Sequence, residues 1–189
     1  TYTYVSGPST RGTGSANIDG IIKLNALRSN QRASLTLLDG VIYITWSSHS
    51  DVNPYHGWLI GFDARTLVPI PGQIFSSTPD GEEGGIWMGG CGPSVDSAGN
   101  LFIAVGNGDY DGRNNWGECF LKISTLGGKL TVLDSFTPSD FENLNHGDRD
   151  LGSSGLTLLP ELTGSPYPHL MIGGGKSGFY YVINRDDMG

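Results

Sequence analysis

Residues 40–46 read GVIYITW, and residues 57–63 read GWLIGFD. Each segment begins with a glycine and continues into a run of aromatic and β-branched side chains, which is typical of β-strands. The same pair returns as GNLFIAVGN (99–107) with ECFLKIS (118–124), and as HLMIGG (169–174) with GFYYVIN (178–184). Corresponding positions lie roughly sixty residues apart, and a fixed period of this order indicates a propeller or solenoid. The sequence therefore predicts repeated sheets of short strands.

The repeats predict an all-β protein built as a β-propeller, of which this chain contributes about three blades. The expected blades cover residues 33–77, 88–137 and 154–189, and residues 1–32 are expected to hold the end of a preceding blade and a loop. In the first blade we expect strands near 34–38, 41–47, 57–63 and 68–76. The segment TYTYV (1–5) is strand-like, residues 6–20 are expected to form an irregular loop, and no helix longer than a turn or two is predicted.

Three blades do not close a ring, because each blade buries its faces against neighbours around a central channel. We therefore expect the chain to be a piece of a longer polypeptide. The remaining blades of the same protein are its expected structural partners.

Composition narrows the functional classes. Thirty glycines, ten prolines and only 16% charged residues favour a turn-rich β protein over a helical one. The net charge of −8, with eleven scattered Lys and Arg residues, argues against nucleic acid and anionic membranes as partners. The sequence contains no run of eighteen apolar residues, so it predicts no membrane-spanning helix.

Two cysteines, Cys91 and Cys119, are too few for a disulfide scaffold and lack the local spacing of a zinc site. The repeat places them on the first and third strands of one blade. Neighbouring strands are about 4.8 Å apart and bridged Cα atoms rarely exceed about 7 Å, so a direct bridge would have to skip a strand. The two cysteines are therefore expected to be either free buried thiols or a single disulfide near the end of the blade.

Polar loops join the predicted strands and gather on the faces of a propeller. His49, Asp51 and His56 form either a metal or acid–base cluster, or hydrogen-bonded ties between loops. The segment that begins at Asp109 and Asp111 has an Asp-x-Asp-Gly start without the glutamate of an EF-hand, so a surface calcium site there is an alternative to a plain turn.

Four short runs carry a family resemblance: NQR (30–32), YHGW (55–58), GIW (85–87) and GNG (106–108). With these runs the whole chain resembles the pyrroloquinoline quinone (PQQ) type β-propellers, most closely a branch of secreted or predicted proteins. The resemblance implies a complete propeller of eight blades and an extracellular or periplasmic location.

A second resemblance is to the quinoprotein alcohol dehydrogenases. It implies that Asn107, which ends a Gly-Asn strand, ligates calcium beneath the quinone, and that Asp150 is the catalytic base and a calcium neighbour. Lys176, two positions before a Gly and an aromatic strand, would contact the quinone oxygens, and Trp87 is a candidate platform for the cofactor. Asp51, slightly out of register with the family's calcium glutamate, is a further candidate calcium ligand beside Asn107 and Asp150.

The implied activity is oxidation of an alcohol or sugar with calcium and PQQ. Calcium would polarise a quinone carbonyl, a carboxylate would remove the alcohol proton, and a lysine would stabilise the developing negative charge. The chain departs from the family in lacking a Cys-Cys pair and in carrying Gly108 after Gly-Asn.

Structural roles compete with each of these assignments. Asn107 could form a left-handed turn, Asp150 could tie down a loop and Lys176 could be a solvated turn residue. Trp58 and Trp87 could pack between blades instead of serving as platforms for a sugar or quinone. The alternative function is a non-catalytic propeller that binds a carbohydrate, another small molecule, a peptide or a protein.

Overall fold

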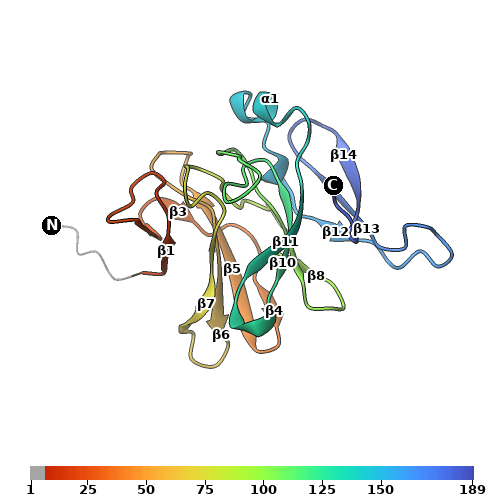
Figure 1. Cartoon of the computed structure of the whole chain (residues 1–189), viewed down its shortest axis with the longest axis horizontal. Helices are drawn as coiled ribbons and strands as arrows, with labels where there is room; N and C mark the ends of the chain where they lie inside the picture. Colours follow the sequence, from red (N-terminus) through yellow and green to blue (C-terminus); the bar gives the residue numbers. More distant parts are fainter. Residues whose placement is uncertain (1–6) are drawn as a thin grey trace.

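The computed structural model describes residues 7–189 as an all-β protein whose sheets are antiparallel and follow one another along the chain. The strand-like segment 1–5 lies outside the described residues. In Figure 1 the sheets follow one another across the molecule, from β3–β7 through β8–β11 to β12–β14.

The first sheet contains the four predicted strands of the first repeat. They are β4 (Thr36–Leu38), β5 (Val41–Ser48), β6 (Trp58–Asp63) and β7 (Pro69–Ser76), so their predicted positions are confirmed. Asp39 and Gly40 both have positive φ, 48° and 78°, as a two-residue type I′ hairpin turn requires. A short strand β3 (Ser29–Asn30) pairs with the far end of β5, so part of the segment assigned to a preceding blade joins this sheet.

The second sheet has the order β11-β10-β9-β8. Its strands are β8 (Ser94–Val95), β9 (Leu101–Ala104), β10 (Phe120–Ser124) and β11 (Thr131–Phe136). All four residues of β9 are buried, so this strand lies in the core and reads as a continuous apolar run.

The third sheet has three strands, β12 (Thr157–Leu158), β13 (Leu170–Gly174) and β14 (Tyr180–Asn184), in sequence order. It packs closely on the second sheet. The contact is tight enough that a Cβ atom at Gly173 would lie 2.6 Å from the ring of Phe120. The Phe120 ring also contacts Phe136 and Tyr181, with centroid separations of 5.8 and 6.0 Å. The second and third repeats therefore share one core.

The predicted irregular loop at 6–20 is wrong in part. β1 (Ser9–Arg11) pairs with β2 (Ile21–Lys23) in a separate two-stranded sheet. β1 is short, polar and mostly exposed, so it carries no alternating apolar signal that the sequence could reveal.

Helical segments are short, as predicted. They are η1 (Leu126–Gly128), α1 (Phe141–His146) and η2 (Leu151–Ser153). No helix within residues 7–189 has the length and apolar character needed to cross a membrane.

The predicted positions of the cysteines are wrong, because both precede their strands. Cys91 lies in the turn before β8, where Gly92 and Pro93 delay the start of the strand, and Cys119 comes directly before β10. Both thiols are free. Cys119 is buried and Cys91 is exposed, so neither expected arrangement holds in full.

Candidate ligand-binding pocket

A cavity of about 190 Å³ is lined by residues from loops that connect to the first, second and third sheets. Its lining residues are Arg32, Asp51, Trp87, Asp150, Ser153 and Lys176. They come from the turns and loops that lead out of or into strands β3, β5, β8, β12 and β13. Four of them, Asp51, Trp87, Asp150 and Lys176, are predicted site residues that the sequence separates by up to 125 positions (176 − 51).

Lys176 and Asp150 form the centre of the pocket's polar wall. The Lys176 ammonium contacts the Asp150 carboxylate and also lies 2.9 Å from Asp148 Oδ1. The Lys176 backbone N–H donates to the Asp150 carbonyl at 3.1 Å, which ties the β13–β14 turn to the segment before η2. Burial alone would lower the pKa of Lys176, but the hydrogen bonds to Asp150 and Asp148 outweigh it and raise the pKa to about 12. The lysine is therefore a cation at neutral pH.

Asn107 lies beside this pair without lining the cavity. Its backbone N–H donates to Asp150 Oδ1 at 3.1 Å, and its side-chain amide donates to Asp148 Oδ1 at 3.2 Å. Its Oδ1 atom is buried and has no hydrogen-bond partner among the described residues. Asn107 is not among the residues with positive φ, so the left-handed turn considered for it is wrong.

Gly106 makes room for the carboxylate beside the tryptophan. A Cβ atom here would lie 2.6 Å from Asp150 Oδ1 and 3.1 Å from Trp87 Cδ1. Both separations are too short for an ordinary side chain, so the glycine allows Asp150 and Trp87 to approach the same strand end. Packing around Asp150 therefore gives the Gly-Asn run a structural reason, in addition to its resemblance to a metal-binding motif.

Glu118 is a buried acid, bonded to the residue after Asp150, that sequence reasoning missed. Its Oε2 atom accepts a 2.6 Å hydrogen bond from the Leu151 N–H, and its Oε1 atom is buried without a partner in the described chain. Burial raises the pKa of Glu118 to about 7, against the opposing effect of the Leu151 hydrogen bond. This carboxyl group therefore titrates near neutrality and supports the residue that follows Asp150.

Asp51 is held in place by its own loop. Its Oδ1 atom accepts hydrogen bonds from Ser48 Oγ at 2.9 Å and from the Tyr55 hydroxyl at 3.0 Å. Burial, together with the negative charge of Asp51, raises the pKa of Tyr55, so the phenol remains a hydrogen-bond donor. The Asp51 carboxylate is thus fixed at the pocket wall.

The oxygen atoms around Asn107 do not fit a calcium ion. Calcium takes six to eight oxygen ligands, usually including several carboxylates. Here one Asp150 oxygen accepts the Asn107 N–H and the other contacts the Lys176 ammonium. Asp148 Oδ1 is likewise engaged by the Asn107 amide and Lys176, so only Asn107 Oδ1 and Asp148 Oδ2 remain as oxygen ligands. Within residues 7–189, no group of three or more His, Cys, Asp or Glu side chains is arranged to hold a metal.

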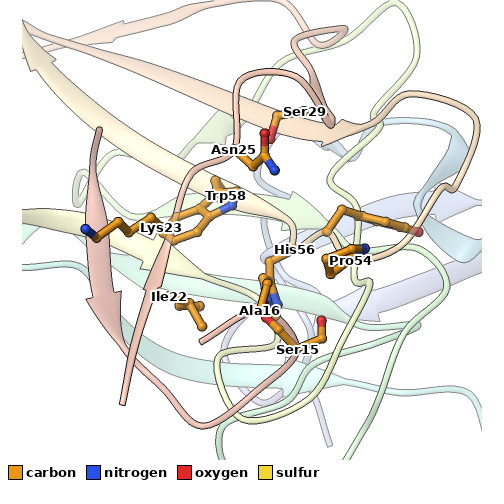
Figure 2. Close-up of a pocket in the computed structure, with 10 residues that line it drawn as sticks. Ser15, Ala16, Ile22, Lys23, Asn25, Ser29, Pro54, His56 and Trp58 are labelled. Carbon is orange, nitrogen blue, oxygen red and sulfur yellow. Dashed lines mark hydrogen bonds between the residues drawn. The ribbon is translucent and has the colours of Figure 1, made fainter. Parts of the chain in front are cut away.

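A second, much smaller cavity surrounds His56 and holds about 20 Å³ (Figure 2). This is room for about one water molecule. The two His56 ring nitrogens hydrogen-bond to Ser15 O at 2.8 Å and Thr78 Oγ1 at 3.2 Å, so this buried imidazole ties loops together. Of the two roles considered for His56, the structure supports the structural tie.

The Asp111 loop is likewise closed by its own hydrogen bonds. Asp111 Oδ1 accepts the backbone N–H groups of Arg113, Asn114 and Asn115, and Oδ2 accepts the Asn115 side-chain amide. These bonds lower the pKa of Asp111 against the opposing effect of its burial. The arrangement is that of a structural turn, with both carboxylate oxygens already used.

Comparisons with known proteins do not assign the chain to a family. No family model matches the chain, and no curated protein matches it.

Proposed function

We propose that the three sheets are successive blades of a PQQ-like β-propeller, eight-bladed when complete. The proposal is supported by the order of the strands, since β4–β7 and β8–β11 each run in sequence from one edge of the sheet to the other. It is also supported by the pocket, which receives residues from strand ends of each sheet. Such a ring needs further blades from the same protein, and we keep an extracellular or periplasmic location as part of this proposal.

We propose that the pocket binds a small carbohydrate without transforming it. The observation that carries this proposal is the cavity of about 190 Å³, in which Trp87 lies among hydrogen-bonding and charged side chains. A sugar ring has apolar C–H faces that an indole can cover, and hydroxyl groups that carboxylates and cations can bind. The volume is below the 300–1,000 Å³ typical of sites for drug-sized ligands, so it favours one sugar unit.

A calorimetric titration with D-glucose and D-galactose tests this function. We expect saturable heat with a Kd on the order of a millimolar, because one small ring makes few contacts. Trp87→Leu should abolish the heat. Tyr180→Leu is the matched control, since Tyr180 is an aromatic residue with 82% exposure outside the pocket, and it should leave binding unchanged. Absence of heat with every sugar tested would contradict the proposal.

The second candidate function is a quinoprotein-type oxidoreductase acting on an alcohol or sugar. The convergence of Asn107, Asp150, Lys176 and Trp87 around one cavity supports it. The occupied oxygens of Asp150 weaken it, because the calcium ion would compete with the Lys176 ammonium. Calcium and PQQ therefore stay predictions, and we derive no catalytic step through them.

Titration of calcium and then PQQ into the protein separates the two candidates. Calcium-dependent, saturable PQQ binding that is lost in Asp150→Ala and Asn107→Ala would favour the oxidoreductase. Binding of neutral sugars with no response to calcium or PQQ would favour the carbohydrate-binding protein.

A further inference from the structure

Arg32 lies at the pocket wall and is exposed to solvent. Within residues 7–189 no Asp or Glu forms an ion pair with Arg32, whereas Lys176 in the same wall contacts two carboxylates. The Arg32 Nε atom lies beside Gly89, at 3.8 Å from the position that a Cβ atom there would take. Ser153, which also lines the pocket, has its carbonyl oxygen 3.0 Å from the same position. Arg32 and Ser153 therefore approach Gly89 together.

The remaining charges of the pocket are already assigned. Asp150 contacts the Lys176 ammonium, which it shares with Asp148, and Asp51 accepts hydrogen bonds from the neutral hydroxyls of Ser48 and Tyr55. Arg32 and Asp51 line the same pocket, but within residues 7–189 no ion pair joins them. The Arg32 guanidinium and the second Asp51 oxygen are therefore both open to a ligand. A ligand that matches this wall brings an anionic group to Arg32 and donates a hydroxyl hydrogen to Asp51.

From this arrangement we infer that the pocket selects a sugar that carries a carboxylate, a uronate, over the corresponding neutral sugar. The inference rests on the carbohydrate-binding function proposed above. The guanidinium of Arg32 is planar and presents a fork of N–H donors that matches the two oxygens of a carboxylate. Trp87 covers a face of the ring, and the ring hydroxyls donate to Asp51. Arg32 is the residue that determines this specificity.

The size and overall charge of the protein limit the ligand to a small anion. The cavity of about 190 Å³ accepts a single ring. The net charge of −8 repels a polyanion at long range, whereas one carboxylate at Arg32 experiences a local cation.

The test compares sugars that differ only at C6. D-glucuronate and D-galacturonate are titrated calorimetrically against D-glucose and D-galactose, at one pH and at two salt concentrations. We expect the uronates to bind at least about tenfold more tightly than their neutral partners, and this preference to shrink as salt rises. Arg32→Met should bring uronate affinity down to that of the neutral sugar, while Arg32→Lys should retain part of the preference because it keeps the charge without the fork.

Arg65→Met is the matched control. Arg65 is exposed in the β6–β7 turn, at the opposite end of the first sheet from the β5–β6 turn that holds Asp51, so it should leave every affinity unchanged. Circular dichroism should show all three variants folded, because Arg32 and Arg65 make no ion pairs in the described chain.

Two negative results have different meanings. Equal affinity of wild type for uronate and neutral sugar, or an unchanged preference in Arg32→Met, would overturn the inference and leave the carbohydrate-binding function intact. Absence of binding by every sugar would overturn both.

Discussion

The Lys176 ammonium contacts the Asp150 carboxylate, and this ion pair joins the turn between β13 and β14 to the segment that leads into η2. The Asp150 side chain is only 7% exposed, whereas the Lys176 side chain is 44% exposed. The pair therefore consists of a nearly buried carboxylate and a cation that reaches it from the surface of the pocket.

Removing this cation should destabilise the fold. Lys176→Met leaves the Asp150 carboxylate buried without its cation, a change that costs about 3–5 kcal/mol for fully buried pairs. Because Lys176 is partly exposed and water screens the charge, we expect a smaller loss of about 1–2 kcal/mol in the free energy of unfolding. Urea unfolding measures it, and Lys129→Met, at an exposed lysine in no ion pair within residues 7–189, is the control. Equal stability of the two variants would contradict this role of Lys176.

Glu118 should make stability fall as the pH rises from about 4.5 to about 7. Its pKa is higher in the folded protein than the ordinary value of 4.5, so the unfolded chain releases the proton first and is stabilised relative to the folded state over this window. The loss in the free energy of unfolding is on the order of 3 kcal/mol. Glu118→Gln keeps an acceptor for the Leu151 N–H without a titrating group. Its stability should therefore lack this slope, and a wild-type slope in Glu118→Gln would contradict the assignment.

Gly106→Ala should damage the pocket itself. Its Cβ atom would meet Asp150 and Trp87, so we expect weaker sugar binding and a loss of about 1–3 kcal/mol in stability. Gly20→Ala separates the two effects, because Gly20 has open space around it but a φ of 73°. That control should lose stability through its backbone and bind sugar normally. Sugar binding by Gly106→Ala at wild-type affinity would show that this packing does not shape the site.

The two cysteines should differ in reactivity towards a thiol reagent. Cys91 is exposed, whereas Cys119 is buried, and burial raises its pKa to about 12 despite a hydrogen bond with Thr137. We expect one thiol to react in the native protein and two after denaturation, as counted by Ellman's reagent. A count of zero in the denatured, unreduced protein would indicate a disulfide and contradict the structure.

Much of the fold could be predicted from local sequence. Strands β5 and β6 follow from their aromatic and β-branched runs, and the turn at Asp39 and Gly40 follows from its Asp-Gly pair. β1 could not be predicted, because its three polar residues form a strand only by pairing with β2. The starts of the strands after Cys91 and Cys119 were likewise set by the local turns rather than by the period of the repeat.

The pocket was predicted in part. The family resemblance pointed to Asp51, Trp87, Asp150 and Lys176, and the structure brings these four together. Arg32 belongs to the NQR run (30–32), which assigned it no role, and no sequence pattern pointed to Ser153. The burial of Glu118 depends on two segments distant in sequence as well as its own. Its N–H donates a hydrogen bond to the Gly106 carbonyl, and its carboxylate accepts one from the Leu151 N–H. No pattern within the ECFLKIS run distinguishes it from an exposed strand residue.

The most direct test of the binding pocket is heteronuclear NMR of the tryptophan indole N–H groups during a titration with D-glucuronate and D-glucose. The chain has four tryptophans, and Trp87→Phe assigns the signal of Trp87. We predict that the Trp87 signal shifts and saturates while those of the fully buried Trp58 and of Trp46 stay in place. A Trp87 signal that does not move at saturating sugar, or shifts of equal size at all four indoles, would contradict the account.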